Sequence, residues 1–126
     1  MYSDTTWQHF AAATETLAGS GSMKERLFAA YRNELAELNI EMLPGELRAD
    51  YIHWHASLHR ERPLRGEDAV RATLRKLSGQ EADRLAQALV RISIRLLRIA
   101  PPNKNDALEM RSQSAGGGSV VQLFPS

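Results

Sequence analysis

The 126-residue chain is 43% hydrophobic and 25% charged, carries a net charge of +1 and contains no cysteine. These values are typical of one globular domain, and the lack of cysteine excludes disulfide bonds and thiolate chemistry. No stretch reaches the roughly 20 apolar residues of a membrane-spanning helix, and the first residues lack the features of a secretory signal. We therefore expect a cytoplasmic protein that does not associate with membranes.

Apolar residues recur at steps of three and four through most of the first 100 residues, which predicts an all-α fold. The first stripe runs from Trp7 to Ala18. Gly19-Ser20-Gly21 follows it and should end the first helix, because glycine and serine favour turns. This segment lacks the spacing of a phosphate-binding loop, so we expect a simple interhelical turn.

The second helix has a clear start. Ser22 and Glu25 have the spacing of a capping box, in which each side chain binds a backbone N–H of the other residue. The apolar stripe that follows extends to Met42, and Pro44 should open the next helix. Three acidic residues lie opposite that stripe, on a face that we expect to be solvated: Glu34, Glu37 and Glu41.

Two shorter helices are predicted in the middle of the chain. The third carries an apolar stripe from Leu47 to Leu58 and should stop before Pro63, because the residue preceding proline disfavours helical dihedral angles. The fourth covers roughly residues 67–77. A second capping box, Ser78 and Glu81, then begins a new helix.

The last helix has the broadest apolar face in the chain. Its stripe runs from Ala82 to Ile99, and further apolar residues, including Ile94 and Leu97, widen the arc. Such a helix normally occupies the centre of a bundle. We therefore predict a compact bundle of four to five helices as one domain over residues 1–100.

Residues 101–126 are predicted to form a flexible C-terminal tail, because they begin with Pro101-Pro102 and are rich in Asn, Ser, Gln and Gly. An apolar segment, Val120–Phe124, lies near its end. Gln122-Leu123-Phe124 is similar to part of the peptides that bind the bacterial sliding clamp. The alternatives are a disordered end and an end that folds back on its own bundle.

Three histidines, His53, His55 and His59, fall within seven residues of the third helix. His55 and His59 are four residues apart, a spacing that can place two imidazoles on one metal ion. A zinc site needs more ligands than this, so we interpret them as histidines at the edge of the core. Because the chain also lacks a glycine-flanked nucleophile, we expect no metal, no cofactor and no enzyme activity.

Charge is unevenly distributed, since residues 1–43 hold three basic and six acidic side chains and residues 44–100 hold eleven and seven. This asymmetry indicates either a dipolar surface that aids solubility or a basic half that meets an acidic partner. Protein–protein interaction, as a regulatory or adaptor module, is the predicted function. The predicted contact residues, which would form charge-assisted hydrogen bonds, are Arg60, Arg62, Arg65, Arg71 and Arg75.

Nucleic-acid binding is the alternative function. The short fourth helix, the turn at Ser78-Gly79 and the last helix have the outline of a helix-turn-helix, and arginines attract phosphates. The last helix is very apolar for a helix that lies in a groove of DNA, which favours the first interpretation. A homodimer is also possible, because two-fold dimers are the commonest oligomers.

Overall fold

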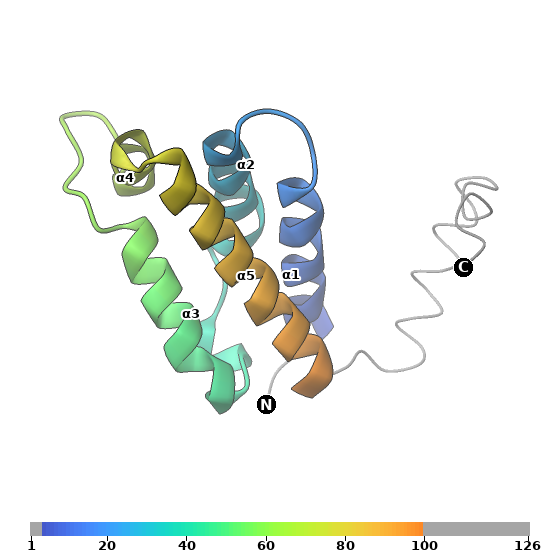
Figure 1. Ribbon diagram of the computed structural model, residues 1–126. Coiled ribbons are helices and arrows are strands. Elements are labelled where there is room, and N and C mark those ends of the chain that lie inside the picture. The colour runs from blue at the N-terminus through green and yellow to red at the C-terminus, as the bar shows by residue number, and fades with distance from the viewer. Residues whose placement is uncertain (1–3, 100–126) are drawn as a thin grey trace.

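The computed structural model describes residues 4–99, which form five α-helices and no strand (Figure 1). The predicted all-α fold is therefore confirmed. The predicted tail, 101–126, lies outside the described residues. So does Gln122-Leu123-Phe124, the part of the tail that is similar to clamp-binding peptides. The helices are α1 (Asp4–Leu17), α2 (Met23–Ala30), α3 (Gly45–Leu58), α4 (Ala69–Lys76) and α5 (Gly79–Ile99).

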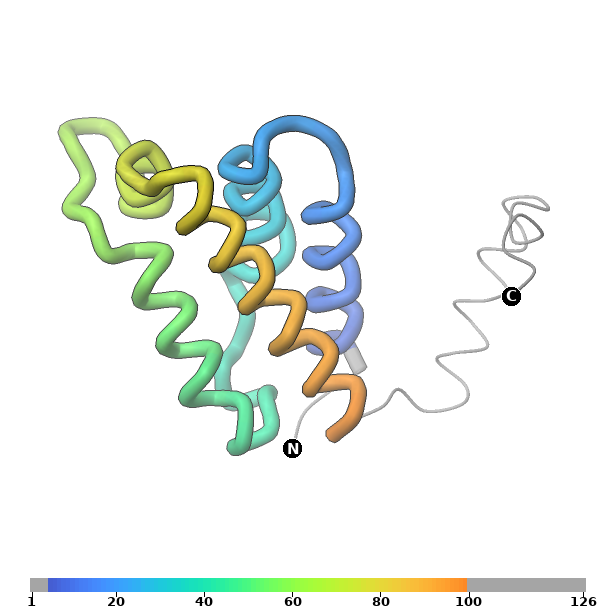
Figure 2. The backbone as a smooth tube through the Cα atoms, viewed as in Figure 1, coloured from blue at the N-terminus to red at the C-terminus, as the bar shows by residue number. Residues whose placement is uncertain are grey.

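Helix α5 is the central element, as its broad apolar face predicted. It crosses the bundle obliquely and packs against α1, α2 and α3. Along the backbone trace, α1 and α3 run in the direction opposite to α5 (Figure 2). Its inward side chains are buried, including Leu89, Ile92 and Leu96. Burying a side chain of this size contributes roughly 1.5–3 kcal/mol, so this helix holds the other three together.

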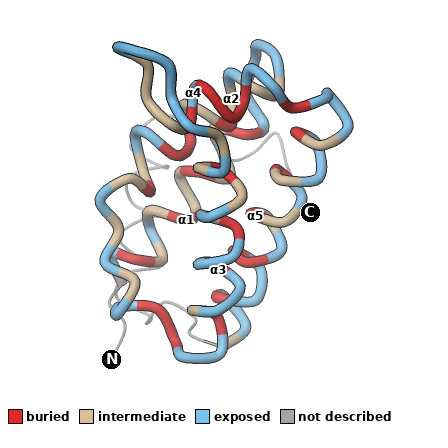
Figure 3. The backbone as a smooth tube through the Cα atoms, turned by 90° about the vertical axis from the view of Figure 1, so that its left-hand side faces the viewer, coloured by how far each residue is buried: buried red, intermediate tan, exposed pale blue. Residues whose placement is uncertain are grey.

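Buried residues line the inner side of every helix, and α3 shows the pattern most clearly (Figure 3). Its predicted stripe, Leu47, Tyr51, Trp54 and Leu58, is at most 2% exposed. The ring of Phe10 meets Tyr51 edge to face, with 5.8 Å between centroids. Edge-to-face pairs are favourable because the positive rim of one ring meets the negative face of the other.

Both predicted capping boxes are present. The backbone N–H of Glu25 donates to the Ser22 hydroxyl, and the N–H of Ser22 donates to the Glu25 carboxylate. Ser78 and Glu81 make the same pair of bonds. Hydrogen bonds from the serines lower the pKa of both glutamates, because they stabilise the charged form. Helices α2 and α5 therefore begin where the sequence predicted.

The second predicted helix is shorter than its apolar pattern suggested. After α2 the backbone widens into a π-helical turn, Tyr31–Leu35, in which the N–H of Ala36 donates to the carbonyl of Tyr31 at 2.8 Å. Such π turns are rare and arise where packing shifts the helical register. Both Tyr31 and Leu35 point inward in this turn, where they are 7% and 1% exposed.

The prediction that the helix extends to Met42 was therefore wrong. The side chain of Asn39 accepts the N–H of Glu41 and starts a separate 3-10 turn, Ile40–Met42. A side chain that binds nearby backbone competes with the helical ladder, which explains the early end. Met42 is 37% exposed, whereas the following residue, Leu43, is buried.

The acidic face of this segment is not wholly solvated. The Nδ1 atom of His9 on α1 lies 3.2 Å from a carboxylate oxygen of Glu34, whose side chain is 27% exposed. Glu37 and Glu41 are exposed, as expected. Spacing along one helix could not reveal this pair, because its two members are 25 residues apart.

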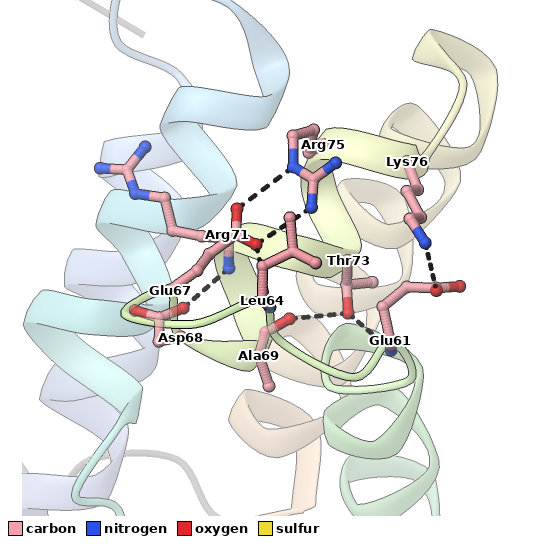
Figure 4. Close-up of polar contacts among 9 residues, drawn as sticks. All are labelled: Glu61, Leu64, Glu67, Asp68, Ala69, Arg71, Thr73, Arg75 and Lys76. Atoms are coloured by element: carbon pink, nitrogen blue, oxygen red, sulfur yellow. Dashed lines mark hydrogen bonds and ion pairs between the residues drawn. The ribbon is translucent and has the colours of Figure 1, made fainter.

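A network of polar contacts fixes α4 against the long connection that follows α3 (Figure 4). The hydroxyl of Thr73 is buried, donates to the carbonyl of Ala69 at 2.8 Å and accepts the N–H of Glu61 at 3.0 Å. The side chain of Asp68 caps α4 by accepting the N–H of Arg71. The connection is thus attached to the helix at two points.

Replacing Thr73 with valine should lower the free energy of unfolding by about 1–3 kcal/mol, because the N–H of Glu61 loses its acceptor while the side-chain volume is kept. Urea unfolding monitored by circular dichroism measures this change. Thr73→Ser keeps the hydroxyl and is the matched control for the hydrogen bond. Equal stability of Thr73→Val and the parent would contradict the structural role given to this bond.

Within residues 4–99, no helix has both the length and the apolar character that crossing a membrane requires. The cytoplasmic location expected from the sequence stays a prediction.

Candidate binding groove between α3 and α5

A hollow lies between α5 and α3. Its volume is about 470 Å³, within the range of roughly 300–1,000 Å³ typical of ligand pockets. We call it the α3–α5 groove. Helix α3 supplies Asp50, His53, Trp54 and Ser57. Arg60, two residues beyond the last residue of α3, lies at one end of the groove. The remaining lining residues are Leu77, Glu81, Arg84, Leu85, Ala88, Arg91, Ile92 and Arg95.

The floor of the groove is apolar and rigidly held. Trp54 is only 2% exposed, and its indole N–H donates to the backbone carbonyl of Leu85 at 2.9 Å. This hydrogen bond joins α3 to α5 across the floor. The neighbouring Leu85 and Ala88 are half-buried, so they present apolar surface to any occupant. A preformed apolar floor favours binding, because little order must be gained on association.

The rim of the groove carries four arginines but only two carboxylates. Arg95 pairs with Asp50 across the groove, and Arg60 lies 3.8 Å from Glu81. Among the residues that the structure describes, neither Arg84 nor Arg91 has a carboxylate within 4.0 Å. Two guanidinium groups are therefore free to bind an anionic ligand.

The five arginines predicted as the contact residues do not play one role. Arg60 lines the α3–α5 groove. The guanidinium of Arg71 lies over the ring of Phe28, 3.9 Å from its centroid, a distance that suits a cation–π contact. Arg75 donates two hydrogen bonds to Glu67, at 3.0 and 3.2 Å (Figure 4). These two contacts hold α4 in place.

Arg62 and Arg65 lie on the exposed connection between α3 and α4. Within residues 4–99 neither forms an ion pair. Their place in a contact surface stays a prediction, and the groove is not lined by either of them. The structure thus separates these two arginines from Arg60, although the three are close in sequence.

The arginines of α5 that line the groove were not among the predicted contact residues. Arg84, Arg91 and Arg95 follow one another at seven- and four-residue steps, which places them on one side of α5. Asp50, His53 and Ser57 show the same kind of spacing on α3. Each pattern is readable, but nothing in either stripe says that the two helices are neighbours.

The histidine cluster is divided by the fold. His53 points into the α3–α5 groove, while the rings of His55 and His59 stack on the other side of α3, with 4.1 Å between centroids. The Tyr31 hydroxyl lies 3.2 Å from Nε2 of His55. No group of three or more His, Asp or Glu side chains among residues 4–99 is arranged to hold a metal ion.

Burial and the neighbouring ring of His59 lower the pKa of His55, because both disfavour the protonated imidazole. The folded protein therefore binds this proton less tightly than the unfolded chain, in which histidine titrates near pH 6.5. The contribution of neutral His55 to stability is complete above that pH and is lost as the pH falls below it.

We expect the free energy of unfolding to fall as the pH is lowered from about 7.5 to about 5.5. Urea titrations at several pH values measure this dependence. In His55→Gln the decline should be shallower, because the group that resists protonation is gone. The same slope in that variant and in the parent would assign the pH dependence to other groups.

Comparisons of the chain with protein-family models, with curated proteins and with solved structures gave no match.

Proposed function

We propose that the chain is a small, non-enzymatic interaction module whose α3–α5 groove binds an acidic, amphipathic segment of a partner protein. The observation that carries this proposal is the pairing of an apolar floor with an arginine rim in one hollow. Apolar side chains of the partner would enter the floor, and its carboxylates would meet Arg84 and Arg91. This is the helix-in-groove mode of peptide recognition.

The dimensions of the groove suit a short helical segment. Its lining runs along α3 from Asp50 to Ser57 and on to Arg60, a length of roughly 15 Å at 1.5 Å per helical residue. A partner helix of about three turns spans that length. The Asp50–Arg95 ion pair lies toward one end, and the Arg60–Glu81 pair lies toward the other.

Two features favour a protein partner over a nucleic acid. Trp54, the indole of the groove floor, is 2% exposed and so offers no face on which a base could stack. Helix α5 packs against three other helices, which keeps it from entering a major groove as a recognition helix does. Binding of a DNA duplex is nevertheless measured directly in the same experiment.

The test is fluorescence anisotropy with a labelled, designed peptide of about 14 residues that carries leucines at helical spacing and glutamates between them. We expect binding that weakens between about 50 and about 300 mM salt, because free guanidinium groups contribute to it. A peptide with lysine in place of each glutamate controls for apolar attraction alone. A labelled DNA duplex controls for general attraction to anions.

Arg84→Glu/Arg91→Glu should weaken binding of the acidic peptide by about tenfold or more, since each change replaces attraction with repulsion. Arg62→Glu/Arg65→Glu alters the charge by the same amount outside the groove and should leave affinity within about twofold. A loss confined to the second variant would return the contact surface to the predicted cluster around Pro63. Tighter binding of the duplex than of the peptide would overturn the proposal in favour of nucleic acid.

A further inference from the structure

Helix α5 has a second open side, where it meets α1. A hollow of about 230 Å³ lies there, with lining residues from both helices and no charged side chain among them. We call it the α1–α5 seam. Its outer edge is formed by Trp7 on α1 and by Val90, Ile94 and Leu97 on α5. A neighbouring hollow shares Thr14 and Val90 with it, extends to Met23 of α2 and has the charged residues Asp83 and Arg91 in its lining.

The α1–α5 seam leaves large apolar side chains in contact with solvent. Ile94 is 45% exposed and Leu97 is 41% exposed, although both belong to the broad apolar arc of α5. They are the two most exposed large apolar side chains of α5, so they mark a part of the arc that residues 4–99 leave largely uncovered. Contiguous exposed apolar surface usually serves as a contact site.

The base of the seam is closed, so an occupant would lie on it without entering the core. The hydroxyl of Thr14 donates to the carbonyl of Phe10 and to the Ser93 hydroxyl, at 2.9 and 3.2 Å. Ser93 in turn donates to the carbonyl of Leu89 at 3.0 Å. These bonds satisfy the two hydroxyl groups beneath the seam, whereas the buried indole N–H of Trp7 has no hydrogen-bond partner among the described residues.

The chain itself contains a segment of matching chemistry. Val120, Val121, Leu123 and Phe124 supply four large apolar side chains within five residues, and no charged residue occurs from 112 to 126. The α3–α5 groove is rimmed by arginines, whereas the α1–α5 seam is uncharged. Because the segment carries no charged side chain, it would gain nothing from the arginines of the groove. The uncharged seam is therefore its better match.

The length of the connecting chain permits this contact. Residue 120 is 21 positions beyond Ile99, where α5 ends, and a flexible chain of that length has an end-to-end distance of roughly 25 Å. The α5 edge of the seam, Val90 to Leu97, is about 10 Å long and lies just before that end. Gly116-Gly117-Gly118 allows the chain to reverse direction.

We propose that Val120–Phe124 folds back in the same molecule and covers the α1–α5 seam, with its apolar side chains against Trp7, Ile94 and Leu97. Covalent attachment raises the local concentration of the segment to about the millimolar range, so a weak contact is sufficient. The proposal is independent of the function proposed for the α3–α5 groove. In that arrangement, a competing apolar partner would have to displace Val120–Phe124 from the seam.

The test uses the full chain and its lack of native cysteine. A nitroxide attached to Ser119→Cys would broaden the NMR signals of nearby nuclei, and the amides of Ala11 and Ile94 report on the seam. We expect these two signals to lose more than about half of their intensity relative to the reduced label, at a ratio independent of protein concentration. The amide of Ser57, in the α3–α5 groove, should keep its intensity.

Leu123→Asp/Phe124→Asp in the labelled chain should restore the two signals, because charged side chains are costly to bury against apolar surface. Ser112→Asp/Ser114→Asp adds the same charge without removing apolar groups and should leave the broadening unchanged. The absence of broadening in the labelled parent would overturn the proposal. So would broadening that appears only between molecules, when spin-labelled protein is mixed with unlabelled, isotope-enriched protein, because the occupant would then be a second copy.

Discussion

The burial of one broad apolar arc on α5 is the constraint on which the rest of the structure depends. A helix of 21 residues that packs against α1, α2 and α3 must be apolar over more than half of its circumference. Because the three neighbours cover only its inner side, α5 meets solvent along two edges. One edge carries Arg84, Arg91 and Arg95, and the other carries Ile94 and Leu97. The two candidate surfaces are thus consequences of a single packing arrangement.

Many of the arginines have structural contacts within the protein. Arg75 is bound to Glu67, Arg71 lies over Phe28, and Arg32 of the π turn pairs with Asp68 at the start of α4. Arg26 donates to the carbonyls of Leu17 and Gly21 and so fixes the turn between α1 and α2. Exposed ion pairs of this kind are individually weak, but they orient short elements. A count of charges therefore overstates how many are available to a partner.

The two edges of α5 differ in the ligands they suit. The α3–α5 groove combines apolar contact with two unpaired guanidinium groups, so its specificity would come from charge and would respond to salt. The α1–α5 seam has no charged lining, so contact there would depend on apolar burial alone and would be insensitive to salt. One helix can in this way hold an internal contact on one side and receive a partner on the other.

The sequence by itself determined the all-α class, the two capping boxes and the buried stripe of α3, because each depends on residues within a few turns of one another. Only the tertiary structure decided that Arg95 faces α3 while Ile94 faces α1, that His53 is separated from His55, and that the second helix stops at a π turn. These outcomes depend on which helices become neighbours. Periodicity shows that a face must be buried, but it does not identify the helix that buries it.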